Sequence, residues 1–155
     1  MRYLRQLAAA SFVSILVVGG IGDSRETGLQ LTENQKQEFL QRLSAAAIER
    51  THHAVRYDPA YVGIPYPGGD VPADTGVCTD EVIRAYRELG IDLQKEVHED
   101  MEANLSAYPN HWPWMLAHSD SNIDHRRVPN LMVFFGRKGE KLSISTHGAD
   151  YTPGT

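Results

Sequence analysis

The sequence predicts a mostly helical α+β domain. Three segments repeat apolar residues at the three-to-four-residue spacing of a helix that buries one face, and they lie within 33–53, 78–90 and 93–108. A fourth, shorter helix is predicted to begin near Pro129, and residues 141–145 alternate polar and apolar side chains like a strand. A chain of 155 residues is long enough for one domain with its own core.

The N-terminal segment has the composition of a secretory signal peptide. Arg2 and Arg5 precede an uncharged run, residues 7–22, which ends in the small-x-small pattern Gly20-Ile21-Gly22. A buried core helix and an uncleaved anchor are the alternatives, but the run is short for a membrane span. We therefore expect a signal peptide at 1–22 and export to the periplasm or cell envelope.

The charge of the chain argues against two classes of partner. The net charge is −5, and removal of residues 1–22 takes two basic residues and no acidic residue, which lowers it to −7. The basic clusters at 125–127 and 137–138 are short and have acidic residues nearby. We therefore expect no nucleic-acid binding and no stable membrane insertion after the signal peptide is removed.

The mature chain is predicted to start with a polar linker at 23–31 and to continue as one domain at 32–155. Thr32 and Gln35 have the spacing of a capping box, which predicts a helix over 33–53. Its apolar face comprises Phe39, Leu40, Leu43, Ala47 and Ile48.

A long loop then leads to Cys78, the only cysteine of the chain. From Tyr57 onward the segment is rich in residues that disfavour regular structure, namely Pro59, Pro65, Pro67, Gly68, Gly69, Pro72 and Gly76. A helix is predicted to begin at or just after Cys78 and to stop at Gly90, with an apolar face of Val82, Ile83, Tyr86 and Leu89. Loops of this length are uncommon in a compact domain unless they are functional.

The position of Cys78 predicts a nucleophile. A single cysteine cannot form an internal disulfide, so the thiol is buried and inert, paired with another chain, or reactive. The N–H groups and the positive dipole end at a helix start favour the thiolate form. The alternative is a small apolar residue packed under the helix, as most free cysteines are.

The C-terminal part is predicted to add two more helices and a strand. Asp92 is the expected cap of a helix that ends at Tyr108-Pro109, with a face of Leu93, Val97, Met101 and Leu105. After a loop over residues 110–124, Pro129 opens a helix that carries Leu131, Met132, Phe134 and Phe135 and stops near Gly136 to Gly139. The strand at 141–145 follows.

The best candidate for a general base is His125, within Asp124-His125-Arg126-Arg127. Asp124 could orient its imidazole, or the arginines could bind a substrate carboxylate. The alternative is a capping and salt-bridge cluster that leads into the next helix. His98 lies on a charged helix face and is expected to be solvated.

Other chemistries have little support in the sequence. The chain has no Cys-x-x-Cys or His-Glu-x-x-His spacing for a metal and no Gly-x-Ser-x-Gly motif for a serine nucleophile. We therefore expect neither a metal nor a cofactor.

The segment around the cysteine contains three motifs: Val62-Gly63-Ile64-Pro65-Tyr66-Pro67-Gly68-Gly69, Cys78-Thr79-Asp80, and Tyr86-Arg87-Glu88-Leu89-Gly90-Ile91. With these motifs, the segment resembles the nucleophile region of NlpC-like cell-wall peptidases. The chain departs from the family pattern at Val77 and at Thr79-Asp80. Residues 57–93 together with 122–130 resemble more closely a bacterial secreted domain family of unknown function in the same papain-like clan.

The resemblance implies a papain-like, NlpC-like α+β fold, represented mostly by its helical half with the C-terminal sheet largely missing. It implies a cysteine hydrolase that acts on peptide or amide bonds of peptidoglycan, with Cys78 as nucleophile and Tyr66 beside it. Asp80, Asp124, His125 and Arg126 are the other candidate substrate-binding residues.

The family's catalytic histidine lies on a strand after a Pro-Gly-Asp turn, which Tyr151-Thr152-Pro153-Gly154-Thr155 resembles. The chain is therefore expected to stop before that histidine. The alternative function is a non-catalytic cell-envelope binding protein that uses the same groove.

Overall fold

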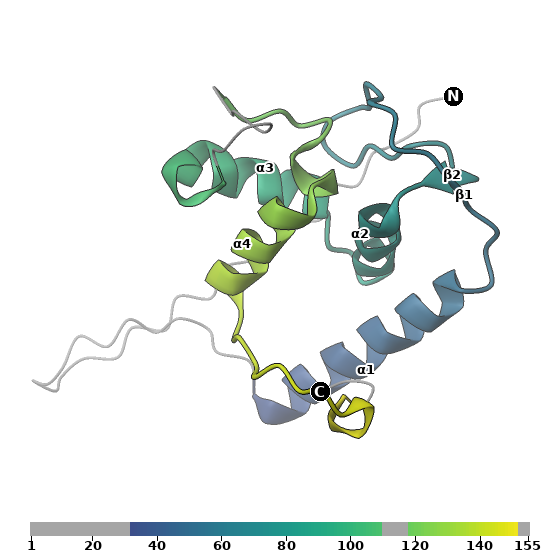
Figure 1. Cartoon of the computed structure of the whole chain (residues 1–155), viewed down its shortest axis with the longest axis vertical. Coiled ribbons are helices and arrows are strands. Elements are labelled where there is room, and N and C mark those ends of the chain that lie inside the picture. The colour runs from purple at the N-terminus through teal and green to yellow at the C-terminus, as the bar shows by residue number, and fades with distance from the viewer. Residues whose placement is uncertain (1–31, 110–117, 152–155) are drawn as a thin grey trace, which may run out of the picture. The chain divides into compact units, whose positions relative to one another are not determined.

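The computed structural model describes residues 32–109 and 118–151. In these ranges the chain is mostly helical and contains one two-stranded sheet (Figure 1), so the predicted α+β class is confirmed. The predicted signal peptide and linker, most of the 110–124 loop, and the turn at 152–155 lie outside the described residues. Among the described helices, none combines the length and the apolar character that a membrane span requires.

The first helix, α1, spans Glu33–Arg50 and begins as predicted. The backbone N–H of Gln35 donates to Oγ1 of Thr32 at 3.3 Å, and the backbone N–H of Thr32 donates to Oε1 of Gln35 at 2.9 Å. The helix ends three residues before the expected position 53, because residues 51 and 52 form a turn. Arg50, in its last turn, donates to Glu81 at 2.8 Å and so joins α1 to the next helix.

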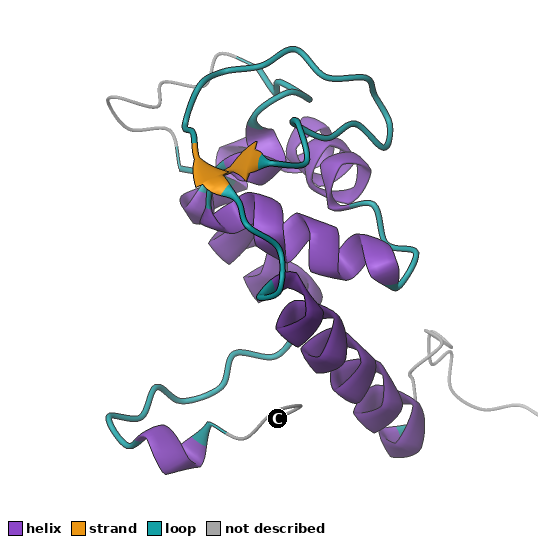
Figure 2. Ribbon diagram, turned by 90° about the vertical axis from the view of Figure 1, so that its right-hand side faces the viewer, coloured by secondary structure: helices purple, strands orange, loops and turns teal. Residues whose placement is uncertain are grey.

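The loop before the cysteine contains a short sheet that the sequence did not predict. Strands β1 (Arg56–Tyr57) and β2 (Thr75–Gly76) pair in parallel, with Arg56 opposite Thr75 and Tyr57 opposite Gly76. Figure 2 shows the pair beside the helices, with the intervening loop arching away from it. Prolines and glycines exclude a longer strand here but allow this two-residue contact.

The main core lies between three helices. Helix α2 spans Cys78–Glu88, α3 spans Leu93–Asn104 with Asp92 as its cap, and α4 spans Val128–Lys138 with Pro129 in its first turn. The short helical turns are η1 (Leu105–Ala107), η2 (Asp124–Arg126) and η3 (Gly148–Asp150). The buried apolar residues of this core are Ile83, Leu93, Val97, Met101, Tyr108, Leu131 and Phe134.

The predicted pattern is wrong in several details. Ile48 and Val82 were placed on the apolar faces of their helices but are 56% and 39% exposed, because the buried part of each helix is narrower than the apolar stripe. Met132, on α4, is 68% exposed. The strand predicted at 141–145 is absent, and Leu142 and Ile144 are 67% and 95% exposed. An alternating pattern forms a strand only where a partner strand pairs with it, and the described residues provide none there.

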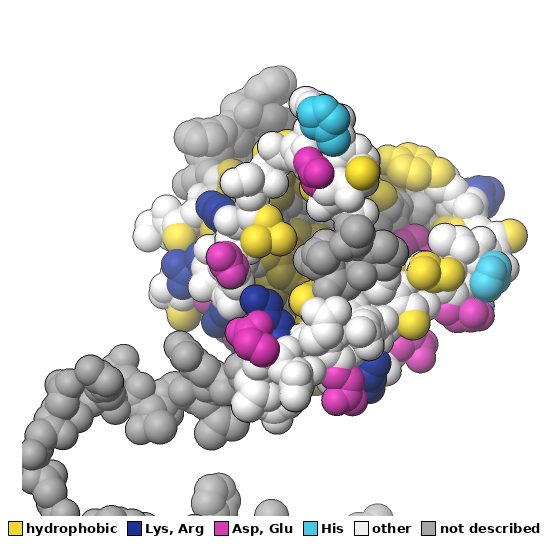
Figure 3. Space-filling view, turned by 90° about the horizontal axis from the view of Figure 1, so that it is seen from below, with side chains coloured by type: hydrophobic (Ala, Val, Ile, Leu, Met, Phe, Trp, Pro, Cys, Tyr) yellow, Lys and Arg dark blue, Asp and Glu magenta, His cyan; other side chains and the backbone are white. Residues whose placement is uncertain are grey.

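The surface mixes both signs of charge. On the face seen in Figure 3, Lys and Arg side chains lie next to Asp and Glu side chains, and hydrophobic side chains lie inside a hollow. This mixture agrees with the absence of a large basic cluster in the sequence.

Candidate functional site

Cys78 is the first residue of α2, and its side chain is exposed. Strand β2 leads directly into this helix through Val77, whose backbone is extended (Figure 1). The expectation of a thiol at a helix start is therefore confirmed. The exposure of Cys78 also excludes the alternative of a small residue buried under the helix.

The thiol borders a cavity of about 460 Å³. Three segments form its walls: residues 57–61, the start of α2, and the segment from η2 into α4. The described residues that line it are Tyr57, Pro59, Tyr61, Val77, Cys78, Thr79, Ile123, Arg126, Arg127, Val128 and Pro129. Aromatic and aliphatic side chains dominate this set, and no histidine or carboxylate belongs to it.

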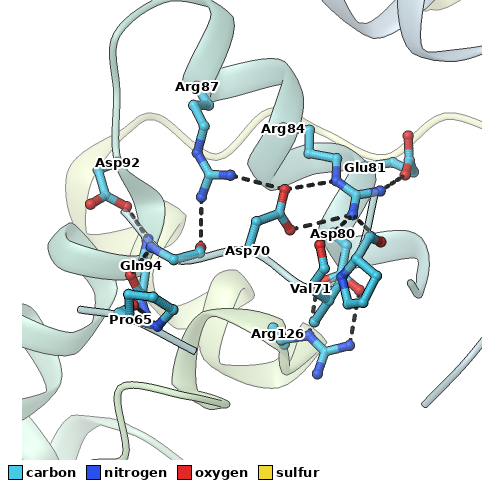
Figure 4. A network of polar contacts seen from close by, with 12 residues as sticks. Pro65, Asp70, Val71, Asp80, Glu81, Arg84, Arg87, Asp92, Gln94 and Arg126 are labelled. Carbon is cyan, nitrogen blue, oxygen red and sulfur yellow. Dashed lines mark hydrogen bonds and ion pairs between the residues drawn. The ribbon is translucent and has the colours of Figure 1, made fainter. Parts of the chain in front are cut away.

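Asp80 and Arg126, both predicted to bind substrate, bind each other instead (Figure 4). Arg126 donates from Nε to Oδ1 of Asp80 at 2.8 Å and from Nη2 to Oδ2 at 3.0 Å. The exposed fractions of Asp80 and Arg126 are 2% and 6%. Arg126 still lines the cavity, whereas Asp80 lies behind the wall.

The same pair connects the three walls. Oδ2 of Asp80 accepts a hydrogen bond from the backbone N–H of Val77 at 2.7 Å, which caps the helix next to the cysteine. Nη1 of Arg126 donates to the carbonyl of Ala60 at 3.2 Å, and the hydroxyl of Thr79 donates to the carbonyl of Arg126 at 2.9 Å. Side chains far apart in sequence thus determine the shape of the cavity.

Tyr66 does not line the cavity. Its ring packs edge-on against His98, with 5.1 Å between ring centroids, and the residue is 42% exposed. The tyrosines that line the cavity beside the thiol are Tyr57 and Tyr61. The hydroxyl of Tyr61 donates to Asp120 at 3.0 Å.

Asp124 orients a different histidine from the one expected. Asp124 is fully buried, and its Oδ2 lies 3.1 Å from Nδ1 of His98 and accepts from the backbone N–H of Asp120 at 2.6 Å. Burial raises the pKa of the Asp124 carboxyl despite these contacts. The His98 side chain is only 13% exposed, so the expectation that it is solvated is wrong.

His125 lies in the interior and does not line the cavity. The residue is 2% exposed, and burial lowers the pKa of its imidazole to about 4, so the ring is neutral at neutral pH. Its Nδ1 is buried and has no hydrogen-bond partner among the described residues.

The structure brings together Cys78 and Arg126 of the predicted site, and it places Tyr66, Asp124 and His125 elsewhere. Within the described ranges, no cluster of three or more His, Cys, Asp or Glu side chains has a geometry that would hold a metal ion.

Comparison with known proteins assigns the family. Residues 44–155 match the model of a domain of unknown function, DUF1287. The chain belongs to this family. The expected membership in a domain family of unknown function is therefore confirmed.

A curated relative of the DUF1287 domain is the uncharacterized protein YijF of Escherichia coli (strain K12). The two chains are 55% identical over 98 residues, which are 63% of this chain and 47% of YijF. The chain therefore spans about half the length of the curated relative it matches. No solved structure matches this chain.

Sequence reasoning missed two buried polar residues that hold the loop of this DUF1287 domain. Nη2 of Arg84 donates to the carbonyl oxygens of Val71, Pro72 and Thr75 at 3.1 to 3.4 Å, and Nε donates to Asp70 at 3.0 Å (Figure 4). Gln94 is completely buried, and it binds three backbone groups, Gly69 N–H and the carbonyls of Pro65 and Ser121. The positions of Arg84 and Gln94 in the sequence do not indicate this role, because polar residues on a helix are usually solvated.

Proposed function

We propose that this DUF1287 domain is a cysteine hydrolase-type domain that acts on peptide or amide bonds of peptidoglycan, with Cys78 as its nucleophile. One observation carries the proposal: Cys78 is exposed at the first residue of an 11-residue helix and borders a cavity of about 460 Å³. The fold is proposed to be papain-like, on the sequence resemblance around Cys78.

The reaction would proceed through an acyl-enzyme. Sγ of the Cys78 thiolate attacks the carbonyl carbon, and N–H groups of the first helical turn stabilise the oxyanion. The amine leaves with the proton that the general base took from the Cys78 thiol, and water then hydrolyses the thioester, which releases the acid and restores the thiol. The apolar walls at Tyr57, Tyr61 and Val128 would hold the part of the substrate next to the reacting bond.

Thiol reactivity tests the nucleophile. The folded chain is expected to react with iodoacetamide at neutral pH faster than a free model thiol with a pKa of about 8.5. Cys78→Ala, which removes the only thiol, is the control for non-specific labelling. Labelling only after denaturation would contradict the proposal.

The general base is the second part of the proposal. None of the described cavity-lining residues is a histidine. We propose that a histidine outside this set supplies the base, and loss of such a base lowers rates by about 10²–10⁴-fold. The wild-type protein should release soluble peptides from purified peptidoglycan, and Cys78→Ala should not.

A non-catalytic envelope-binding domain is the second candidate, and the same absence of a cavity-lining histidine favours it. Sedimentation with peptidoglycan separates the two functions. A binding domain remains bound to the pellet and releases nothing, whereas the hydrolase releases peptides and loses this activity in Cys78→Ala.

Export is also part of the proposal, on the pattern of residues 1–22. A C-terminally tagged chain should be recovered outside the cytoplasm, shortened by about 20 residues if the signal is cleaved. Recovery of the full-length chain from the cytosol alone would contradict both the location and a peptidoglycan substrate.

A further inference from the structure

We propose that the Asp80–Arg126 ion pair is a positioning element for Cys78. In this pair Arg126 compensates the charge of Asp80 at the start of α2, and the pair holds that start against the other two walls of the cavity. This inference rests on the proposed nucleophilic role of Cys78. It assigns Asp80 and Arg126 to the support of the thiol rather than to substrate binding.

The cap explains why Asp80 is present. Its Oδ2 accepts from the Val77 N–H at 2.7 Å, so the carboxylate fixes the backbone on the N-terminal side of Cys78. A carboxylate at this position stabilises the helix, but its negative charge also disfavours a thiolate two residues away. A cap with an uncompensated charge would therefore oppose the chemistry of the thiol.

Arg126 resolves this conflict. Its two hydrogen bonds of 2.8 and 3.0 Å to Asp80 place a guanidinium against both carboxylate oxygens in a buried setting. The side-chain exposed fractions are 3% for Arg126 and 2% for Asp80, so solvent screens the pair little. The cap remains in place while its charge is compensated.

Arg126 also connects the start of α2 to the 57–61 wall. Through Ala60 O and Thr79 Oγ1 it contacts the 57–61 segment and the first turn of α2. Gly76 leaves room for the pair, since a Cβ there would lie 2.9 Å from Oδ2 of Asp80. The start of α2 is thus held by contacts from both neighbouring walls.

The other charged groups near the thiol are few among the described residues. Glu81 in the same helical turn is paired with Arg50 and Arg84, each at 2.8 Å. The remaining titratable or charged groups among the described lining residues are Tyr57, Tyr61 and Arg127. Asp58, in the 57–61 wall, pairs with Arg56 at 3.3 Å. Asp80 and Arg126 are therefore the pair whose separate removal changes the local charge in opposite directions.

The test is the pH dependence of the alkylation of Cys78 by iodoacetamide. Asp80→Asn keeps an acceptor for the Val77 N–H and leaves Arg126 uncompensated, so the midpoint of the pH–rate profile should fall by about one pH unit. Arg126→Gln leaves Asp80 uncompensated, and the midpoint should rise by about one unit. In the double variant Asp80→Asn/Arg126→Gln the midpoint should return close to that of the wild type.

A purely structural role predicts a different result. If the ion pair is only structural, both single variants lose stability and the midpoints of their pH–rate profiles move in the same direction or not at all. That result would overturn the inference. Asp100→Asn is the matched control, because it disrupts an ion pair between the buried Asp100 and the partly exposed Arg137, outside the cavity. This control should lower the stability and leave the midpoint unchanged.

Further outcomes keep the test decisive. If Arg126→Gln does not fold, Arg126→Lys retains the charge and should keep the wild-type midpoint, and Asp80→Asn without a downward shift overturns the inference. A reactive thiol without opposite shifts overturns this inference alone. An unreactive thiol in the folded wild-type chain overturns the proposed function, and the inference with it.

Discussion

Nδ1 of His98, on α3, lies 3.1 Å from Oδ2 of Asp124, on η2, and Asp124 is completely buried. The contact joins two segments that are 26 residues apart in sequence. His98 is one of the hydrogen-bond partners of the buried Asp124 carboxylate. Without this partner the carboxylate would still carry the free-energy cost of its desolvation.

His98→Ala is therefore expected to lower the free energy of unfolding by about 1–3 kcal/mol. His52→Ala is the matched control, because the His52 side chain is 69% exposed and pairs with Glu49, three residues earlier in the chain. The control should change stability by less than about 0.5 kcal/mol. Urea unfolding of both variants at pH 7 measures the difference, and equal losses would contradict the importance of the buried contact.

The buried His125 predicts a loss of stability in acid. Its folded-state pKa of about 4 lies below the ordinary value of 6.5, because burial disfavours the charged ring. Between these two values the unfolded chain binds a proton that the folded chain excludes, so this contribution is complete above pH 6.5 and is lost as the pH falls toward 4.

The loss between pH 7 and 4.5 is expected to be about 2 kcal/mol smaller in His125→Gln than in the wild type. Urea unfolding of both chains at the two pH values provides the measurement. The carboxylates make the same contribution to the pH dependence of stability in both chains, so only the difference between the chains reports on His125. An identical pH dependence in the two chains would refute the assignment.

Gly76→Ala is expected to disturb the start of α2. The backbone at Gly76 has φ of +153°, and an added Cβ would lie 2.9 Å from Oδ2 of Asp80. We expect a loss of about 1–3 kcal/mol, together with slower alkylation of Cys78. Gly63→Ala is the control, because nothing lies within 4 Å of a Cβ there. Thermal unfolding and iodoacetamide labelling measure both effects, and similar behaviour of the two variants would count against a special role for Gly76.

Gln94→Leu is expected to release the loop before the cysteine. The substitution keeps most of the side-chain volume but removes the partners of the Gly69 N–H and of the Pro65 and Ser121 carbonyls. The cost is expected to be about 2–4 kcal/mol, because buried backbone groups lose their hydrogen bonds. Gln41→Leu, at an exposed position of α1, should be near neutral. Faster proteolysis of the 58–74 loop in Gln94→Leu alone would support the explanation, and equal rates would contradict it.

The positions of the helix starts could be predicted because the signals are local. Thr32 and Gln35 are three residues apart, Asp92 caps the amides of Gln94 and Lys95, and Pro129 lies in the first turn of α4. Such contacts form within one helical turn, whatever the rest of the chain does. For the same reason the sequence by itself determined that Cys78 stands at a helix start.

The partners of the charged residues were decided only by the tertiary structure. Asp80 and Arg126 are 46 residues apart, and Asp124 pairs with His98 rather than with the adjacent His125. Asp124 contacts His98, and Nδ1 of the neighbouring His125 has no hydrogen-bond partner among the described residues, so proximity in sequence did not predict contact. The expected strand at 141–145 is absent for a related reason, since pairing depends on a partner segment. Local sequence therefore determined where the thiol stands, and packing between distant segments determined which side chains surround it.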